Sequence, residues 1–234
     1  MENLSPLYEK QETCHLCEQK FSSMKLRNRF VKVVGQDTDL KPNYEDLAMN
    51  PSLYNVKVCP HCGYSFTDDF SKFFAPGTKN VLKEKITNNW VSQDYGQART
   101  IHEAINSYKL AFYSGFLKKE KHLTLAGLAL RTAWFYRDLA ALEEEQRFLA
   151  LAADQYEKAY LNEDLTLTPM SEVKVMYLLA ELHVRLGQWN EAVKYFSKVL
   201  EKQRESREKQ LIEMARDRWY ELRDEMKKNE ASAV

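Results

Sequence analysis

Residues 58–66 read Val-Cys-Pro-His-Cys-Gly-Tyr-Ser-Phe, with Cys59 and Cys62 separated by two residues. Two cysteines at this spacing on a tight turn aim both thiolates at one point, where a metal ion can bind them. Pro60 stiffens the turn, and Gly63 permits a positive φ just after the second cysteine. This segment therefore predicts one half of a thiolate metal site.

A second pair of cysteines near the N-terminus repeats the pattern. In both copies an aromatic residue stands four positions after the second cysteine, so both segments read C-x-x-C-x-x-x-F. Four thiolates are a ligand set of structural Zn²⁺ sites, in which every coordination position is filled. We therefore predict one structural zinc ion. Its predicted ligands are Cys14, Cys17, Cys59 and Cys62. His15 and His61, inside the two turns, are predicted to point away from the metal.

The chain shows no targeting or membrane signal. Residues 1–8 lack a basic start followed by an apolar core, so no secretory signal is expected. The longest uncharged apolar run covers 123–130, whereas a spanning helix needs about 20 such residues. We expect a cytoplasmic protein without membrane contact, whose thiols are kept reduced. A redox-active dithiol is the alternative use of the cysteines.

The spacing between the cysteine pairs predicts an insertion. The 41 residues between Cys17 and Cys59 exceed the usual spacing of about 15–20 in a compact two-turn site. Residues 35–53 are polar and contain two prolines, as expected of inserted chain. Strand-like segments at 30–34 and 54–58 flank it, and we expect them to pair and bring the cysteine pairs together. Residues 1–75 are thus predicted to form a small zinc-ribbon-like β lobe with a long insertion.

Basic side chains recur in the stretch after the first cysteine pair. A basic strand that carries an aromatic residue can bind a phosphate backbone. The candidate nucleic-acid-binding residues are Lys25, Arg27, Arg29 and Lys32. However, residues 1–75 carry 9 basic and 10 acidic side chains, and the whole chain has a formal net charge of zero. A solvated strand face is therefore the simpler interpretation.

From about residue 77 the pattern becomes helical. The 234 residues are 44% apolar and contain only 7 glycines and 6 prolines, which favours helices over a loop-rich or all-β chain. A break at 74–78 precedes this part, and Thr78 can cap the first helix. Helices are expected at about 79–91, 97–117, 121–142, 144–162, 169–187 and 189–202, followed by a charged terminal helix over 203–229.

Three of these helices share a face of small and aromatic residues, which lets a neighbouring helix approach closely. The three faces are Ala104-Tyr108-Ala111, Ala152-Tyr156-Ala159 and Ala192-Phe196-Val199. Around the third copy, Ala180, Gly187 and Trp189 resemble the tetratricopeptide repeat over residues 173–200. The predicted fold is therefore mainly α, with a tetratricopeptide-like helical repeat domain over 76–234 that ends in a capping helix.

Helical repeats of this kind bind peptides on a concave surface. Aromatic and basic side chains on the predicted helices are the candidates for such a groove. They are Arg131, Trp134, Arg137 and His183. None of the common motifs for nucleophilic, metal-dependent or phosphate-binding catalysis occurs in the chain, so we do not expect an enzyme.

Several short elements together resemble one bacterial family. They are Asp37-x-Asp39, Asn50-Pro51-x-x-Tyr54 and Val58-Cys-Pro-His-Cys-Gly-Tyr64. With both cysteine pairs, they make the chain similar to the family catalogued as domain of unknown function 2225, over about residues 8–200. The resemblance implies a bacterial cytoplasmic protein with a zinc-ribbon-like N-terminal region and a helical-repeat remainder. It brings no known activity.

Three hypotheses for function follow from these observations. The leading one is an interaction protein that offers its helical repeats to a protein or peptide partner. The second is a regulator that contacts RNA or DNA through the basic stretch of the zinc lobe. The third is a thiol switch, in which oxidation releases zinc and loosens the N-terminal lobe.

Overall fold

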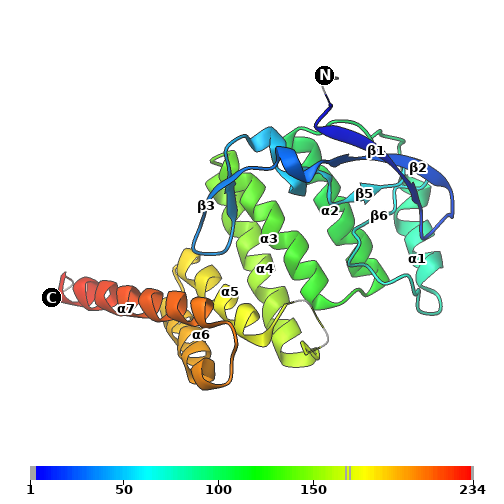
Figure 1. Ribbon diagram of the computed structural model, residues 1–234. Helices are drawn as coiled ribbons and strands as arrows, with labels where there is room; N and C mark the ends of the chain where they lie inside the picture. Colours follow the sequence, from blue (N-terminus) through cyan, green and yellow to red (C-terminus); the bar gives the residue numbers. More distant parts are fainter. Residues whose placement is uncertain (1–3, 167, 169, 233–234) are drawn as a thin grey trace.

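The structure, a computed structural model, describes residues 4–166, 168 and 170–232. Within these residues, seven α-helices follow three two-stranded β-hairpins (Figure 1). The strands are β1 (Leu7–Thr13), β2 (Lys20–Leu26), β3 (Val33–Gln36), β4 (Pro42–Tyr44), β5 (Lys57–Val58) and β6 (Ser65–Phe66). The helices are α1 (Thr78–Lys85), α2 (Ile101–Lys118), α3 (His122–Asp138), α4 (Leu142–Asn162), α5 (Glu172–Arg185), α6 (Trp189–Glu201) and α7 (Lys209–Ser232). The predicted fold class is confirmed: the chain is mainly α, with a small β lobe at its N-terminus.

The strands of the N-terminal lobe pair locally. β1 pairs with β2 around the first cysteine turn, and β5 pairs with β6 around the second. The predicted pairing of 30–34 with 54–58 is wrong, because β3 pairs with β4 inside the insertion and residues 51–54 form a 3-10 helix. Each cysteine turn closes its own hairpin, and strands joined by a short turn lose the least chain entropy when they pair.

The N-terminal lobe packs on the helices through a shared buried cluster. Cys59, Tyr64 and Phe66 belong to the same cluster as Ala104 and Tyr108 of α2. The Tyr108 hydroxyl is itself buried and donates to the backbone carbonyl of Ser52 at 3.0 Å. The segments predicted as 1–75 and 76–234 therefore lie against each other.

A buried arginine ties the chain between α1 and α2 to the start of the second cysteine hairpin. The Arg99 guanidinium donates to the carbonyls of Leu53 at 3.2 Å, Val56 at 2.7 Å and Tyr95 at 2.6 Å. These bonds replace the water that the guanidinium loses on burial. They fix the chain that leads into β5 and the second pair of cysteines.

The helices from α2 to α6 begin and end within about four residues of the predicted positions. The prediction for the first helix is wrong in its cap and its end, because Gly77, not Thr78, is the N-cap residue of α1, and the helix stops at Lys85 before a 3-10 turn.

Two helices begin at recognisable side-chain caps. Thr100 and Glu103 form a capping box at the start of α2, and the Ser171 side chain caps α5. Gly187 follows α5 with φ of 70°, as its predicted role at a helix end requires. α3 with α4 and α5 with α6 form two helix hairpins in a row, and the second and third predicted small–aromatic faces are buried between them.

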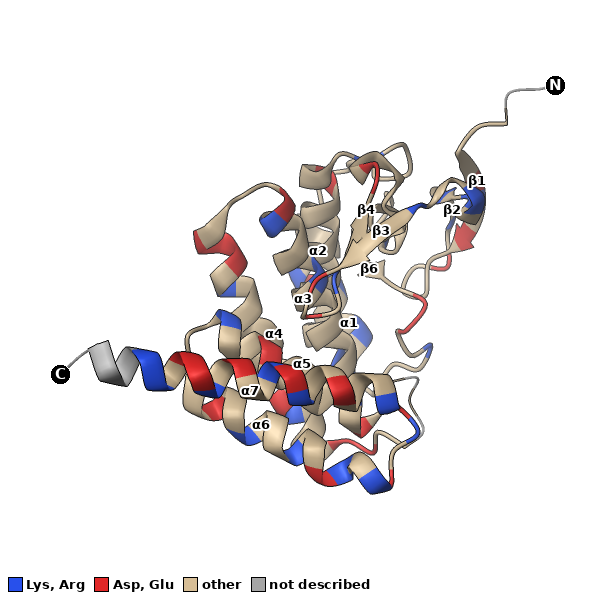
Figure 2. Ribbon diagram, turned by 60° about the vertical axis from the view of Figure 1, so that its left-hand side comes forward, with Lys and Arg blue, Asp and Glu red and all other residues tan. Residues whose placement is uncertain are grey.

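The last helix closes the helical part. Its apolar stripe packs on α5 and α6, with Ala215 and Leu222 fully buried. Charged residues of both signs follow one another along its other faces (Figure 2). Arg218 also reaches α5 and binds the buried Glu181 carboxylate at 2.8 Å. α7 begins at Lys209, later than the predicted 203, because a 3-10 turn over Lys202–Arg204 ends the preceding helix.

The insertion forms the β3–β4 hairpin, which extends beside α3 toward α5 (Figure 1). Its tip, residues 37–41, is called the insertion loop below. The Tyr177 hydroxyl of α5 donates to the Thr38 carbonyl at 2.8 Å. Leu40 adopts φ of 65°, which is unusual for a residue with a branched side chain. Within the described part of the chain, no helix combines the length and apolar character that crossing a membrane requires.

Candidate metal centre and helical groove

The four cysteine sulfurs form one compact cluster. Cys14 lies 3.6 Å from Cys62, and Cys17 lies 3.6 Å from Cys59, measured between their Sγ atoms. All four ligand atoms lie within 4.8 Å of one another. Four thiolates around one metal ion, with metal–sulfur bonds of about 2.3 Å, place their sulfurs about 3.8 Å apart at the corners of a tetrahedron. The arrangement therefore fits a tetrahedral metal ion at its centre.

The two cysteine turns have matching backbone geometry. In the first turn the Glu18 amide donates to the Cys14 carbonyl at 3.0 Å, and in the second the Gly63 amide donates to the Cys59 carbonyl at 2.9 Å. Glu18 has φ of 63° and Gly63 has φ of 73°. Glu18 thus adopts the left-handed conformation that glycine supplies in the second turn, so both turns present their sulfurs in the same way.

The thiols influence one another strongly because they are packed together. Hydrogen bonds from the Cys14 and Cys62 thiols lower the pKa of Cys59 to about 2. Donating to Cys59 raises the pKa of Cys14 to about 12, and donation to both neighbours raises the pKa of Cys62 well above its ordinary range. Without a metal, the cluster therefore favours a thiolate at Cys59 and disfavours deprotonation of Cys14 and Cys62. A bound dication offsets the repulsion among several thiolates.

Aromatic side chains cover the cluster. The His15 ring lies 4.4 Å from the Phe66 ring, measured between centroids, and Phe21 contacts Phe66 edge-on. His61 is exposed. The set of close metal-binding atoms found in the described residues contains the four cysteines. The aromatic residue of each C-x-x-C-x-x-x-F segment thus helps to exclude water from one site.

A tryptophan packs directly on the second turn. The Trp90 indole donates to the Pro60 carbonyl at 2.8 Å. A methyl group added at Gly63 would lie 2.5 Å from Trp90 Cδ2, much closer than atoms can approach. The turn therefore needs glycine for two reasons, positive φ and the contact with Trp90.

These two requirements give a testable difference between two glycines. Gly63→Ala is expected to destabilise the protein by about 2–4 kcal/mol, from left-handed strain plus displacement of Trp90. Gly77→Ala is the matched control, because Gly77 has φ of 80° but no atom within 4 Å of the added methyl group; it is expected to cost about 1 kcal/mol. Urea unfolding measures both. Equal losses for the two variants would contradict the role given to Trp90.

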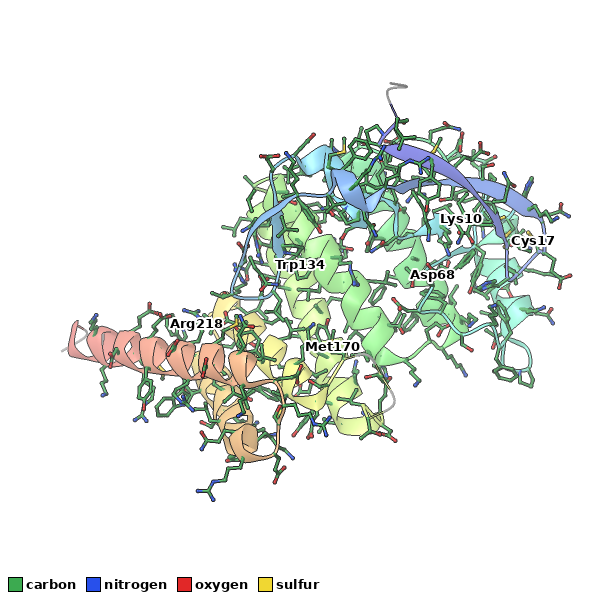
Figure 3. All side chains as sticks on the ribbon, in the orientation of Figure 1. Lys10, Cys17, Asp68, Trp134, Met170 and Arg218 are labelled. Atoms are coloured by element: carbon green, nitrogen blue, oxygen red, sulfur yellow. The ribbon has the colours of Figure 1, made fainter. Side chains whose placement is uncertain are left out.

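A cavity of about 540 Å³ lies between α3, α5 and the insertion loop, and we call it the α3–α5 groove. Trp134 and Arg131, two of the predicted groove residues, line it. Its apolar wall is formed by Leu40, Leu123, Leu130, Trp134, Met170 and Leu178. Figure 3 shows Trp134 beside the β3–β4 hairpin and Met170 nearer the other end of α3.

The other two predicted groove residues lie elsewhere. His183 stacks on Tyr195 with 5.5 Å between ring centroids and bonds Gln188, and it does not line this cavity. Arg137 binds the insertion loop instead. It holds Asp39 through two nitrogens, at 3.0 and 2.7 Å, and it also bonds Asp37 at 2.8 Å.

Sequence reasoning missed the binding of the insertion loop to the helices. Asp39 is fully buried and accepts from Trp134 at 3.0 Å as well as from Arg137, while Arg185 lies 3.3 Å away. The signal in the sequence was the Asp-x-Asp pair, which we interpreted as a family element within a polar inserted loop. Nothing in the local pattern shows that these aspartates face helices about a hundred residues later.

Each residue of the predicted basic stretch has a partner within the protein. Lys32 pairs with Glu45 at 3.0 Å, and Lys25 lies 3.6 Å from Asp68. The Arg27 guanidinium lies over the Tyr8 ring and donates to the carbonyl of Ser5. The Arg29 guanidinium lies over the Phe30 ring. These side chains do not form one continuous strand, because β2 ends at Leu26 and residues 28–30 form a 3-10 helix.

Comparison with known proteins adds a family to this description. A family profile described as "Uncharacterized protein conserved in bacteria (DUF2225)" matches residues 7–222. Searches among curated proteins and among solved structures found no match to the chain. The matched region includes all four clustered cysteines, the insertion loop and most of the helical part. This chain therefore belongs to the bacterial family DUF2225, as its sequence elements predicted.

Proposed function

We propose that this protein is a cytoplasmic, non-enzymatic interaction protein that binds one structural zinc ion and receives a protein or peptide partner in the α3–α5 groove. Zn²⁺ is the ion of choice because it favours four thiolates in a tetrahedral arrangement. Four cysteines complete its coordination and leave no position for a substrate. The metal then holds two hairpins together and supports the lobe from which the insertion loop extends.

The observation that supports the interaction role is that side chains of α3 and α5 at the end of the groove already hold a segment of the protein's own chain. The insertion loop contributes two aspartates and a backbone carbonyl to Arg137, Trp134 and Tyr177. Side chains of α3 and α5 thus bind an acidic, non-helical segment, as repeat proteins bind peptides. The groove continues beyond the loop as an open cavity, where a segment of a partner has room.

Nucleic-acid binding through the zinc lobe has less support. Two of the four basic residues form ion pairs, and the other two are engaged with aromatic rings. A thiol switch also has less support, because three of the four cysteines are buried and only Cys17 is partly accessible. Reactive cysteines are usually accessible to the oxidant.

Site-specific cross-linking in the host bacterium tests the interaction role. A photo-reactive amino acid at Lys121, on the exposed rim of the groove, is expected to capture discrete proteins that remain after nuclease treatment. The same amino acid at Arg147, exposed on α4 outside the groove, is the control and is expected to capture none of them. Identical captures from both positions, or captures lost with nuclease, would contradict the proposal.

A further inference from the structure

The α3–α5 groove combines an apolar wall with unpaired positive charge. Three basic side chains line it: Lys121, Arg131 and Lys174. Among the residues that the structure describes, none of the three makes an ion pair with a carboxylate. Lys121 is exposed, whereas Arg131 and Lys174 are half-buried, and most other half-buried cations of the described chain do have such partners, for example Arg137 and Arg218.

Arg131 is the central charge of the groove. Among the described residues, its one hydrogen bond goes to the carbonyl of Gly127, one turn back in its own helix, at 3.2 Å. Placing a guanidinium in a half-buried position costs free energy unless an anion or several acceptors compensate. The remaining nitrogens of Arg131 are therefore available to an anion that enters from the groove.

The two carboxylates in the lining do not supply this anion. Glu120 is bound to Lys118 and accepts from the Ser71 amide at 3.2 Å. Asp69 is exposed and makes no ion pair with Arg131. Asp69 also lines, together with Asp68, an adjoining cavity of about 210 Å³ that shares Arg131 with the groove, and these two carboxylates would repel an anion there. The anion is thus directed to the side of Lys174.

The apolar side chains of the groove indicate the chemistry of the rest of the ligand, to which the anionic group is attached. The side chains of Leu123, Leu130, Met170 and Leu178 offer no hydrogen-bonding groups, so the part of the ligand that lies against them is expected to be apolar. Leu40 forms the end of this wall, and the bonds of its neighbour Asp39 to Trp134 and Arg137 hold it there in a left-handed conformation. Left-handed non-glycine residues are costly and tend to occur at functional sites. The volume of about 540 Å³ is typical of pockets for small ligands.

We infer that the α3–α5 groove binds an apolar chain that ends in a single carboxylate, with the carboxylate on Arg131 and the apolar part against the leucines. The inference concerns the same groove as the proposed function, on which it rests for biological use, and names the chemistry of what enters it. A free aliphatic acid and the C-terminus of a polypeptide share this chemistry. The experiment separates the two sources.

Calorimetric titration with matched pairs of probes tests the inference. Decanoate below its micelle concentration is compared with decanol, and an acetylated Ala-Ala-Leu-Leu peptide with a free C-terminus is compared with its amide. Saturable binding is expected for at least one acid and at least tenfold weaker binding for its neutral counterpart. The acid that binds identifies the source. Equal affinity for acid and neutral probe, or no saturable binding of either acid, would overturn the inference.

Variants locate the bound acid. Arg131→Gln is expected to weaken binding at least tenfold, whereas Arg147→Gln, at an exposed arginine on α4, leaves it unchanged. Thr124→Trp fills the groove from its rim without altering charge and is expected to abolish binding. Unchanged binding in either Arg131→Gln or Thr124→Trp would overturn the assignment. If these titrations show no binding, cross-linking from position 121 can still capture a partner. The inference and the proposed function can therefore fail separately.

Discussion

Replacing Cys59 with serine is expected to remove the metal and to unfold the N-terminal hairpins. Serine is a poor ligand for zinc, and the three remaining thiols cannot complete a closed tetrahedral site. Zinc binding to small cysteine sites supplies about 10–16 kcal/mol of apparent folding free energy at neutral pH, so loss of a large part of it outweighs any local gain. Metal content should fall from about one zinc ion per chain to near zero.

The loss should extend beyond the metal. The cysteines share a buried cluster with side chains of α2, so unfolding of the hairpins exposes that face of the helix. A loss of about 4 kcal/mol lowers the melting temperature of a chain of this size by about 8–16 °C. Calorimetry and metal analysis of the purified variant measure both effects. Treatment of the native protein with a strong chelator should reproduce them.

His61→Ala is the matched control for this prediction. His61 lies inside the same turn as Cys59 but is exposed and is not part of the metal-binding cluster. Its replacement is expected to leave metal content unchanged and to alter stability by no more than about 0.5 kcal/mol. A metal-free Cys59→Ser variant with unchanged melting temperature would show that the metal does not stabilise the fold.

Asp39→Ala is expected to have the second large effect. Asp39 is fully buried and binds Arg137 through both carboxylate oxygens, with Trp134 and Arg185 beside it. Removal of one partner of a buried ion pair leaves the other charges uncompensated and costs about 3–5 kcal/mol. The insertion loop should then detach from the helices, with a fall in melting temperature of about 6–20 °C.

Glu45→Ala tests whether this loss comes from burial or from charge alone. Glu45 lies in the same insertion and pairs with Lys32, but both side chains are exposed. Exposed pairs contribute about 0–1 kcal/mol, so this variant should be nearly as stable as the native protein. Hydrogen exchange of residues 33–44 follows the loop directly. Protection that persists in Asp39→Ala would show that other contacts hold the loop in place.

The features that local chemistry determines were predictable from the sequence. The spacing of the cysteines predicted one cluster because a C-x-x-C turn has few ways to fold, and the sulfurs lie as expected. The helices followed from apolar periodicity, and Gly187 marked the end of one of them. Each of these sequence signals lies within a few residues of the turn or the helix end that it specifies.

The features that depend on distant contacts were not predictable in this way. Strand pairing in the lobe was wrong because hydrophobic alternation identifies strands but does not select their partners. The binding of Asp39 by Arg137 joins residues 98 positions apart. Both were interpreted separately, Asp39 as a loop residue and Arg137 as a groove residue, and only the folded chain shows that one satisfies the other.

The same long-range contact sets an order of events during synthesis. Both cysteine turns are complete once residue 62 has emerged, so the metal site can close early. Asp39 has to wait for Arg137 and then for Arg185 of α5, which is made 146 residues after it. At about 5–20 residues per second, the insertion loop spends roughly 7–30 s on the ribosome without its binding site. Until Arg137 is made, the cysteine hairpins on either side of the insertion are positioned to restrain the loop, and its two aspartates favour contact with water.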